Sequence, residues 1–490
     1  MTAINTPAAT HYEGVIGLEI HAELETDSKM FCGCAVVDST TAAPNTHICP
    51  ICMGMPGVLP VINRRAVEFA IRVGLALHCE IATLNVFARK SYFYPDLPKG
   101  YQVSQYELPL CTNGWLEIDL PDGGTKRIGI RRAHLEEDTG KSIHVGSSSL
   151  IDFNRSGVPL LEIVTEPDIR NGAEAEAFGR KLRAILVYLG VNSGDMSKGV
   201  LRMEPNISVR PLGSSELRTR TEVKNLNSIR SVQRASDYEI ERQSKLWEGK
   251  GTVVQATMGW DEVKGQTILQ RTKESAHDYR YFPEPDLPPL NISREWVETI
   301  RQTLPELPDA KRDRLMSAGV SAYEASILVA ERPVADYFEA TLKAGAEGKK
   351  AANWIINELF ARMNKIALPT ERVAETKVTP ESIAALIALV DGGTINNNAA
   401  KKVLDALFAE GGEPATWVAR LGLEQTQDTG AIDAAITKIL DAHPEEVARF
   451  KAGEEKVLKF LLGQVMREGR GKFPAELTGT RLEAALKARA

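Results

Sequence analysis

Long apolar runs are missing from this sequence. Its 490 residues contain no stretch of about eighteen consecutive apolar residues, so no transmembrane helix and no membrane partner is expected. Residues 1–13 also lack the basic and apolar regions of a signal peptide, which makes the cytoplasm the expected location. Residues 1–11 are polar and rich in Thr and Ala, and we predict that they form a disordered leader.

Excess positive charge and sequence repeats are absent as well. The net charge is −6, which excludes a bulk attraction to nucleic acid or anionic lipid, so a polyanion would have to bind to a local basic patch. No solenoid repeat and no low-complexity tract is found. The composition, with 43% hydrophobic and 25% charged residues, is that of an ordinary globular protein. The length predicts roughly two to four domains.

The chain changes from a mixed to a helical pattern along its length. Residues 12–292 mix extended segments with helical patterns but show no strict strand–helix repeat, which predicts an α+β cradle domain built on a mixed sheet. Four prolines between residues 281 and 291 end this domain, because proline cannot continue a helix. An all-α helical domain is predicted over 293–410. A Gly-Gly-Glu-Pro break then precedes a small helical tail domain, 411–490.

Local patterns within these domains predict individual elements. Extended segments are expected over 115–120, 126–134, 160–165 and 206–210. Helices are expected over 64–78, 173–189, 294–304, 309–318, 322–330, 333–344, 352–363 and 455–468.

One stretch, Gly17–Leu24, carries a row of polar side chains. Its apolar residues alternate with Glu19, His21 and Glu23, which is the period of a half-buried strand, so the three polar side chains share one face. Successive members of the row would lie about 6.5 Å apart, close enough to share one ion or one substrate. The alternative is the solvated outer face of an edge strand.

Six cysteines are present, and four of them gather between residues 32 and 52. Cys32 and Cys34 precede Cys49 and Cys52, and two closely spaced thiol pairs can close a tetrahedral zinc site. Four thiolate ligands leave no open position, so the zinc would be structural and would hold an insertion over 30–55. Four unlinked thiols are the alternative.

Three further segments combine carboxylates with basic or amide side chains. They are His134–Asp138, with Glu136 and Glu137; 202–210, in which Arg202, Glu204, Asn206 and Arg210 share a face; and 220–227, in which Arg220, Glu222 and Lys224 alternate. A polar outer sheet face explains any one of them. Together with Glu19 and His21 they supply oxygen ligands and cations, which suit Mg²⁺ and the phosphoryl groups of a nucleotide. The set predicts phosphoryl transfer to an acceptor held nearby.

Aromatic and basic residues are interleaved over 89–102, among them Lys90 and Tyr92. Such a stretch can stack a base or a sugar while it holds a phosphate or a carboxylate. A well-packed proline-rich loop is the alternative.

Five segments resemble those of one known family. They are 17–24, 90–96, 134–142, 152–166 and 278–285. From about Tyr12 to its C-terminus the chain is similar to the B subunit of the bacterial aspartyl/glutamyl-tRNA amidotransferase. The resemblance implies a heterotrimer that converts Glu-tRNA(Gln) to Gln-tRNA(Gln) and Asp-tRNA(Asn) to Asn-tRNA(Asn).

The same resemblance implies a division of labour between three proteins. The A subunit would be the glutaminase and would send ammonia through an internal channel. The B subunit would use ATP and Mg²⁺ to phosphorylate the misacylated carboxylate and would let ammonia displace the phosphate. The C subunit, which is small, would wrap the other two. The first domain of this chain would resemble the catalytic fold of glutamine synthetase, and its tail domain would bind tRNA.

Particular residues acquire roles from this resemblance. Mg²⁺ would be held by Glu19, His21 and one of Glu136 and Glu137, with Glu204, Asn206 and Glu222 nearby. Lys90 and Tyr92 would lie beside the end of the ammonia path, so the catalytic set becomes Glu19, His21, Lys90, Tyr92 and Glu137. The cations expected to bind the ATP phosphates are Arg202, Arg210, Arg220 and Lys224. Some members of the family carry the four zinc cysteines and others lack them.

The charge of the tail is compatible with tRNA binding. Between residues 456 and 490, eight Lys and Arg stand against three Glu, a net charge of +5. A local basic patch is what an acidic protein needs to bind tRNA phosphates. A solvated helical face would have the same charge.

Two positions depart from the family pattern. Arg218 stands where a glycine is expected, and if that glycine needed a positive φ, the loop before Glu222 would be shaped differently. Pro205 stands where relatives usually have a small residue, and it restricts Glu204 to the extended geometry that a strand requires.

Two other functions fit parts of the sequence. A carboxylate–amine ligase acting on a free small molecule would use the same acidic groups, but the basic tail and the size of the helical part argue against it. A zinc-containing tRNA-binding scaffold would need the tail but neither Glu19 nor His21.

Overall fold

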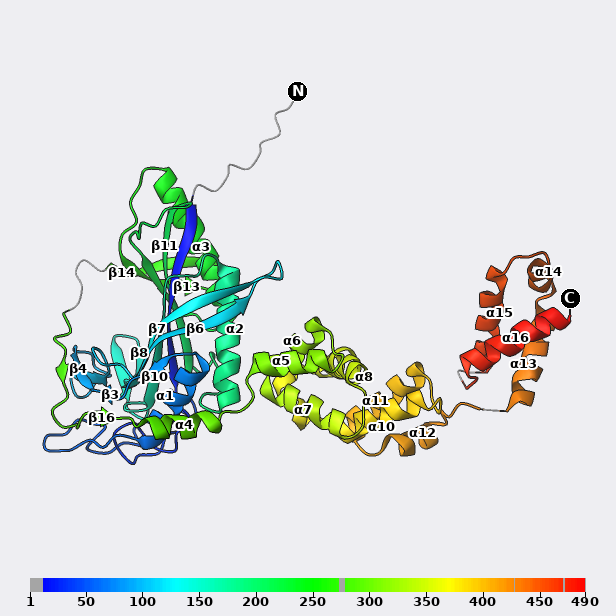
Figure 1. Ribbon diagram of the computed structural model, residues 1–490, viewed down its shortest axis with the longest axis horizontal. Helices are drawn as coiled ribbons and strands as arrows, with labels where there is room; N and C mark the ends of the chain where they lie inside the picture. Colours follow the sequence, from blue (N-terminus) through cyan, green and yellow to red (C-terminus); the bar gives the residue numbers. More distant parts are fainter. Residues whose placement is uncertain (1–11, 273–277, 427, 470–471, 490) are drawn as a thin grey trace, which may run out of the picture. The chain divides into compact units, whose positions relative to one another are not determined.

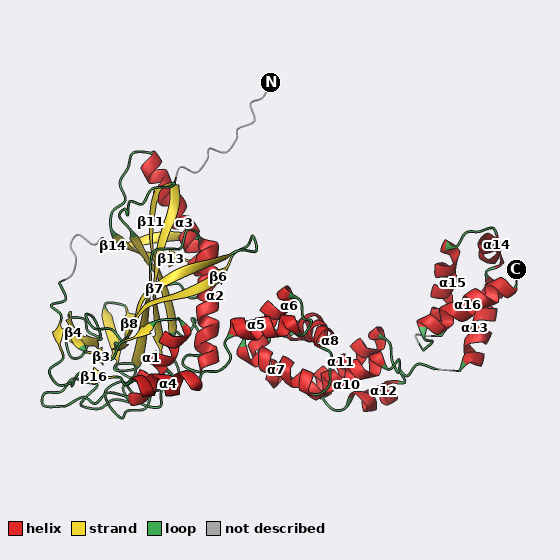
Figure 2. Ribbon diagram, viewed as in Figure 1, coloured by secondary structure: helices red, strands yellow, loops and turns green. Residues whose placement is uncertain are grey.

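The computed structural model describes residues 12–272, 278–426, 428–469 and 472–489. Two compact units divide the chain, the first ending at Pro308 and the second beginning at Asp309. The first unit contains a large mixed sheet with helices and the second is helical (Figures 1 and 2), which confirms the predicted α+β class with a mixed sheet followed by a helical part. The predicted leader, residues 1–11, lies outside the described residues. Among the described residues, no helix is both long enough and apolar enough to cross a membrane.

Twelve strands of the described chain form one sheet in the first unit. They are β1 (Tyr12–Glu23), β2 (Glu80–Ile81), β4 (Ala88–Ser91), β5 (Tyr101–Ser104), β6 (Cys111–Asp119), β7 (Thr125–Glu137), β10 (Pro159–Thr165), β11 (Leu201–Pro211), β12 (Thr221–Lys224), β13 (Ala256–Asp261), β14 (Gln266–Thr272) and β15 (Phe282–Pro283). The order along the sheet is β14-β13-β12-β11-β1-β10-β7-β5-β4-β15, and β6 joins β7 to β2. The pairs are antiparallel except β12 and β13, which are parallel.

Two small two-stranded sheets accompany the large one. Strand β3 (Leu84–Asn85) pairs with β16 (Leu290–Asn291), and β8 (Lys141–Val145) pairs with β9 (Ser148–Asp152). The turn between β9 and β10 leads from the second of these sheets back into the large one.

Strand β1 lies in the middle of the large sheet, between β10 and β11. Its residues Ile16, Leu18 and Ile20 are buried in the main hydrophobic core, whereas Glu19 and His21 are only half-buried and face the other way. That core also contains side chains of α1 (Arg64–Ala76), α2 (Gly172–Leu189) and α3 (Ile229–Glu248). These helices therefore cover one face of the sheet (Figure 2). The opposite face carries the polar residues Glu19 and His21.

Helix α2 illustrates how local signals set these elements. The Asn171 side chain accepts a hydrogen bond from the Glu174 N–H and caps the start of the helix. Gly190 ends it in the left-handed conformation, with φ +65°. The helix predicted over 173–189 is confirmed; three of the predicted extended segments fall within β7, β10 and β11, and the fourth, 115–120, overlaps β6 and runs one residue beyond its end.

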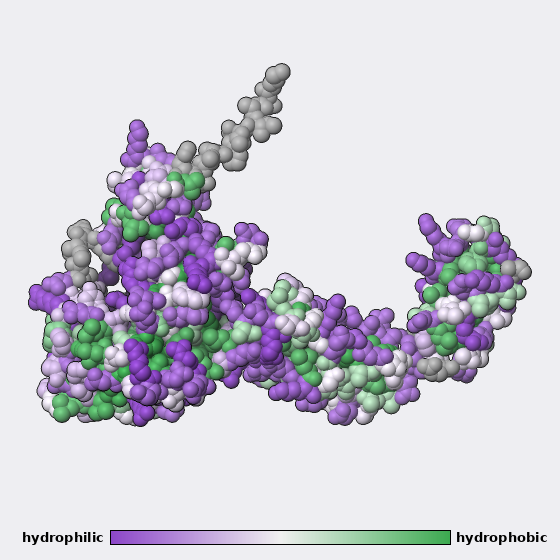
Figure 3. Space-filling view, in the orientation of Figure 1, coloured by the Kyte–Doolittle hydropathy of each residue, from purple (hydrophilic) through white to green (hydrophobic). Residues whose placement is uncertain are grey.

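The second unit is built from helices. They are α5 (Pro308–Ser317), α6 (Ala322–Ala330), α7 (Arg332–Lys343), α8 (Gly348–Asn353), α9 (Phe360–Lys365), α10 (Pro380–Asp391), α11 (Asn397–Glu410), α12 (Pro414–Leu421), α13 (Thr429–Ala442), α14 (Pro444–Lys451), α15 (Lys456–Glu468) and α16 (Ala475–Ala488), with a π-helical segment at Trp354–Leu359 and a 3₁₀ segment at Thr370–Glu375. In the view of Figure 3, hydrophilic residues cover most of the surface of both units.

The hydrophobic cores show which helices pack with which part of the chain. Helix α4 (Arg294–Gln302) places Val297 and Ile300 in the core of the first unit. The second unit has two separate cores, one between Leu315 and Val418 and the other between Ile432 and Leu486. The three-part division with boundaries after residues 292 and 410 stays a prediction.

Candidate active site and cysteine cluster

Polar side chains of neighbouring strands meet on the face of the sheet that the helices leave open. His21 of β1 is paired in register with Glu162 of β10, and Glu162 is paired with His134 of β7. On its other side, His21 is paired with Arg202 of β11. Because directly opposed residues of antiparallel strands point to the same face, the four side chains form one row across the sheet.

A cavity of about 750 Å³ lies over this row and its neighbours. One neighbouring row contains Glu19 opposite Glu204, and the other contains Glu136 of β7 opposite Leu160 of β10. The cavity brings together most of the predicted site residues: Glu19, His21, Lys90, Tyr92, Glu136, Arg202, Glu204, Arg220, Glu222 and Lys224.

His21 stands at the centre of the acidic groups. Its Nε2 lies 3.5 Å from Glu136 Oε1, 3.5 Å from Glu162 Oε2 and 3.8 Å from Glu19 Oε1. Burial alone would lower the pKa of His21, but the hydrogen bond and charge of Glu162 and the charge of Glu136 raise it to about 9. Without a bound cation the imidazolium therefore balances the carboxylates, and a divalent cation would take over that charge and leave a neutral ring as ligand.

Glu162 and Glu136 are the two carboxylates nearest to His21. Burial would raise the pKa of Glu162, but the His134 and His21 rings hold it well below its usual range. Burial and the Glu162 carboxylate raise the pKa of Glu136 to about 7. Among the described residues, the buried Glu136 Oε2 has no hydrogen-bond partner.

Two sets of side chains have the spacing that a metal ion needs. Glu19, His21 and Glu162 offer ligand atoms within 4.8 Å of one another, and so do His134, Glu136 and Glu162. Glu162 belongs to both sets. Carboxylate oxygens with one imidazole suit Mg²⁺, and the unpartnered Glu136 oxygen is an atom that such a cation would satisfy.

Cationic side chains form another wall of the cavity. Lys224 Nζ lies 2.6 Å from Glu204 Oε2 and 3.1 Å from Glu222 Oε1. Arg202 Nη2 donates to Asp138 Oδ2 at 2.6 Å, and Arg220 lines the same cavity. These groups would meet the phosphoryl oxygens of a nucleotide that entered the cavity.

The aromatic wall surrounds Lys90. Its ammonium lies 5.1 Å from the ring centroid of Tyr279 and 5.9 Å from that of Tyr92. The Tyr92 hydroxyl donates to Gln102 Oε1 at 3.0 Å, and burial raises the pKa of Tyr92. Burial opposes the charge on Lys90, but Glu136 and the other anionic neighbours raise its pKa, so the ammonium is kept.

Glu137 does not reach this cavity. Successive side chains of a strand point to opposite faces, and Glu136 of β7 faces the acidic row. Glu137 instead pairs with Lys99 and accepts a hydrogen bond from the Val103 N–H at 3.0 Å. It lines a separate cavity of about 200 Å³ beside the cysteine loops.

Asn206 and Arg210 also lie away from the main cavity, further along β11. Asn206 lines a neighbouring cavity of about 400 Å³, which shares Glu19 and Arg220 with the main one. Arg210 Nε donates to Glu13 Oε1 at 2.6 Å, and Arg210 lines neither cavity.

The two departures from the family pattern fit the local structure. Pro205 lies within β11 opposite Leu18, so Glu204 has the extended geometry that was expected. Arg218 does not adopt a positive φ, and its guanidinium lies 4.5 Å from the centroid of a Trp247 ring.

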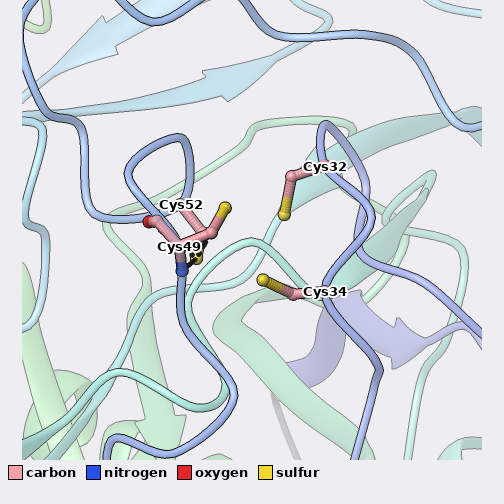
Figure 4. Close-up of side chains that lie close together, drawn as sticks. All are labelled: Cys32, Cys34, Cys49 and Cys52. Atoms are coloured by element: carbon pink, nitrogen blue, oxygen red, sulfur yellow. Dashed lines mark hydrogen bonds between the residues drawn. The ribbon is translucent and has the colours of Figure 1, made fainter.

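The four clustered cysteines come from two loops whose sulphur atoms face a common space (Figure 4). All four sulphur atoms lie within 4.8 Å of one another, and those of Cys49 and Cys52 are 3.9 Å apart. A tetrahedral Zn²⁺ with Zn–S bonds of about 2.3 Å separates its sulphur ligands by about 3.8 Å. The hydrogen bond from Cys32 lowers the pKa of Cys52 to about 4, which favours a thiolate. The cluster can therefore bind a metal such as zinc.

Several residues of the main cavity were not predicted to have a role in the site. The most important is Glu162, followed by Tyr279 and Tyr281, whereas His134 and Asp138 belong to a predicted acidic segment but were given no role in it. Glu162 had a signal in the sequence, because it is the one acid in the apolar run Pro159–Thr165. An ionised carboxylate in a buried strand is costly unless it has a cationic partner.

A polar cavity on one face of a mixed sheet, with converging carboxylates, imidazoles and cations, is the kind of site that defines an enzyme. The chain belongs to the family of aspartyl/glutamyl-tRNA(Asn/Gln) amidotransferase B subunits. Residues 14–298 match the GatB/GatE catalytic domain, and residues 336–486 match the GatB domain.

Close relatives bear the name of the B subunit of aspartyl/glutamyl-tRNA(Asn/Gln) amidotransferase. The protein of Geobacter sulfurreducens is 52% identical over 470 residues, which cover 94% of this chain and 96% of the relative. That of Caldanaerobacter subterraneus is 48% identical over 477 residues, 97% of this chain and 99% of the relative. That of Moorella thermoacetica is 51% identical over 466 residues, 94% of this chain and 97% of the relative.

Proposed function

We propose that this chain activates and amidates the misacylated residue in a tRNA-dependent amidotransferase. The reaction converts Glu-tRNA(Gln) to Gln-tRNA(Gln), Asp-tRNA(Asn) to Asn-tRNA(Asn), or both. The side-chain carboxylate attacks the γ-phosphorus of ATP and ADP leaves; ammonia then attacks the acyl phosphate, inorganic phosphate leaves and the amide loses a proton. The observation that carries the proposal is the convergence of acidic rows and cations in one cavity of a chain of this family.

Four residues would hold Mg²⁺ in this scheme: Glu19, His21, Glu162 and Glu136. The unpartnered oxygen of Glu136 supports its selection over Glu137, whose carboxylate pairs with Lys99 on the other face of the sheet. When bound, Mg²⁺ would offset the charge of the ATP phosphates.

The protein's own cations orient the reacting groups. Lys224, Arg220 and Arg202 would bind phosphoryl oxygens, and Lys224 is already held in place by Glu204 and Glu222. Lys90, which stays protonated, would bind the acyl phosphate from the side of the aromatic wall. The rings of Tyr92 and Tyr279 would keep water from that intermediate, which water would otherwise hydrolyse.

The assembly around this chain follows the family. A glutaminase of the amidase type would supply ammonia through a channel, and a small third protein would complete a heterotrimer. The cradle domain would share the catalytic fold of glutamine synthetase, and the tail domain, 411–490, would bind tRNA. The cysteine cluster would hold a structural Zn²⁺, and the cytoplasm, where thiols stay reduced, suits it.

The test is amide formation on tRNA by the assembled enzyme. With the two partner proteins, ATP, Mg²⁺ and glutamine, either Glu-tRNA(Gln) or Asp-tRNA(Asn) is expected to acquire an amide. Glu19→Ala and His21→Ala should each lower kcat/KM by about 100-fold or more. Glu13→Ala is the matched control, because Glu13 lies on the same strand but pairs with Arg210 away from the main cavity.

Two outcomes would overturn the proposal. One is that both aminoacyl groups keep their acid side chains under these conditions. The other is that Glu19→Ala and His21→Ala leave amidation intact while deletion of the tail abolishes it, which is the result that a zinc-containing tRNA-binding scaffold predicts.

A further inference from the structure

Lys29 is a lysine buried beside the cysteine cluster, with only 1% of its surface exposed. Its ammonium donates to the His47 carbonyl oxygen at 2.9 Å, to the Phe153 carbonyl oxygen at 3.4 Å and to Cys52 Sγ at 3.7 Å. An ammonium has three N–H groups, so each of them has an acceptor in the protein.

The charge of Lys29 needs a counter-charge that carboxylates do not provide. Within the part of the chain that the structure describes, no Asp or Glu forms an ion pair with Lys29, and its acceptors are two carbonyls and one sulphur. A buried ammonium is strongly disfavoured unless a negative charge lies close to it. Cys52 is the one of these three contacts that can carry such a charge, as a thiolate.

A metal-loaded cysteine cluster would in turn need a positive charge close to its sulphur atoms. Four thiolates around one divalent ion carry a net charge of −2, and this charge is also held inside the protein. One ammonium in contact with a ligand sulphur halves it, and an N–H···S hydrogen bond lowers the electron density on that sulphur. Groups that donate to metal ligands in this way orient the ligands and tune the affinity for the metal.

We propose that Lys29 is a positioning residue of the cysteine cluster, whose ammonium holds the Cys52 thiolate by charge and hydrogen bond when a divalent metal such as zinc is bound. The proposal rests on metal binding by the cluster and not on the amidation reaction. It goes beyond the four ligands themselves, since it makes the affinity for the metal depend on a residue that does not touch it.

The other acceptors of Lys29 extend this role toward the candidate active site. Phe153 belongs to the turn between β9 and β10, in which Arg155 donates to the carbonyls of Thr139 at 3.0 Å and Gly140 at 2.8 Å. Arg155 also lies 3.7 Å from Asp138, which lines the main cavity. One ammonium thus joins the metal-binding loop, through the His47 carbonyl, to the turn that supports a wall of that cavity.

The first measurement is metal release from the full-length chain. Zinc-loaded wild type, Lys29→Met and Lys29→Gln are mixed with an excess of a chromophoric chelator, and the rate of zinc transfer is followed. Both variants should release zinc about 10- to 100-fold faster than wild type. Lys198→Met is the matched control, because Lys198 pairs with Asp38 of the same insertion but is largely exposed, and its release rate should be unchanged.

The second measurement separates this role from a purely structural one. Melting temperatures are compared with zinc bound and after zinc is stripped. Zinc should raise the melting temperature of Lys29→Met by less than it raises that of wild type. The proposal would be overturned if Lys29→Met lowered the melting temperature equally in the zinc-bound and the zinc-stripped protein. It would also be overturned if Lys29→Met and Lys29→Gln failed to fold whether or not zinc is present.

A spectroscopic measurement tests the contact with sulphur itself. In the cobalt-substituted protein, loss of the donor to Cys52 should move the thiolate-to-cobalt charge-transfer band to longer wavelength in Lys29→Met but not in Lys198→Met. Unchanged release rates together with an unchanged cobalt spectrum would refute the role of Lys29, and a chain that binds no stoichiometric metal would refute it as well. Neither result would bear on amidation.

Discussion

Exchanging Glu136 and Glu137 separately for glutamine should separate activity from stability. The two residues are neighbours in the sequence but point to opposite faces of β7, toward different cavities. Glu136 lies 3.5 Å from His21 and has an oxygen without a hydrogen-bond partner. Glu137 pairs with Lys99 and accepts from the Val103 N–H. Glutamine preserves the shape of each side chain, removes the charge and replaces one acceptor oxygen by an NH2 donor.

For Glu136→Gln we expect a loss of activity without a loss of stability. If Glu136 holds Mg²⁺ as proposed, this substitution removes one anionic oxygen from the metal site, and kcat/KM should fall by about 100-fold or more, which corresponds to about 2.7 kcal/mol of transition-state stabilisation. Burial raises the pKa of Glu136 from 4.5 to about 7. In the metal-free protein its ionisation therefore destabilises the fold increasingly as the pH rises from 4.5 to about 7, and has its full effect above pH 7. At pH 8 the neutral amide should therefore leave the melting temperature unchanged or raise it.

For Glu137→Gln we expect the reverse. The Lys99 side chain is 11% exposed and would keep its charge with only a neutral partner, a loss of about 2 kcal/mol. For a unit of about 300 residues the entropy of unfolding is about 0.6 kcal/mol per kelvin, so the melting temperature should fall by about 3 °C. Activity per folded molecule should stay within about threefold of wild type, since the side chain lies outside the main cavity.

The assays are ATP-dependent amide formation on tRNA with the partner proteins at saturation, and calorimetry at pH 8 of the metal-free chain. The decisive observation is that Glu136→Gln loses activity but not stability, whereas Glu137→Gln loses stability but not activity. An inactive Glu137→Gln with normal stability, beside an active Glu136→Gln, would show that the faces of β7 have been assigned the wrong way round. Loss of activity in both variants would mean that the active site extends beyond the main cavity to the face of β7 that carries Glu137.

Two further predictions concern the cations and the cysteines. Arg220→Ala should raise the KM for ATP by about tenfold, whereas Arg210→Ala, whose guanidinium pairs with Glu13 outside the main cavity, should leave it unchanged; ATP titration at fixed tRNA measures both. Equal effects of the two substitutions would contradict the assignment. Cys49→Ser should lower zinc content and melting temperature more than amidation per folded molecule, as checked by metal analysis and calorimetry. Full loss of zinc at unchanged stability would contradict a structural metal.

The faces of the strands could be predicted from the sequence, because side chains alternate with a period of two. Glu19 and His21 therefore share a face in the structure as predicted, and Arg202 and Glu204 do as well. The same rule forbids Glu136 and Glu137 from sharing a face. It could not say which of them faces the acidic row, because the predicted strand ended at residue 134 and β7 continues to Glu137.

Helix α3 shows a different limit. Its twenty residues were not predicted as a helix, because its buried positions include Ser236, Glu239 and Gln243 instead of an apolar series at helical spacing. Glu239 is buried because Thr221 and Thr267 donate to it, and these residues belong to β12 and β14. A polar buried face is predictable only when its partners are known.

The register between distant strands accounts for what the sequence could not show about the site. Glu162 faces the cavity because β10 pairs with β1 so that residue 162 stands opposite residue 21, and a slip of one residue would turn every side chain of β10 to the other face. His134 and Arg202 enter the same row through two more pairings, with β7 and β11. Four segments, far apart in the chain, thus contribute one side chain each, and a motif search along one segment sees only one member. The physical constraint that links them is electrostatic: a buried carboxylate at residue 162 is tolerable because the His21 ring, whose pKa is raised to about 9, lies 3.5 Å from it and the Arg132 guanidinium lies 3.8 Å from it.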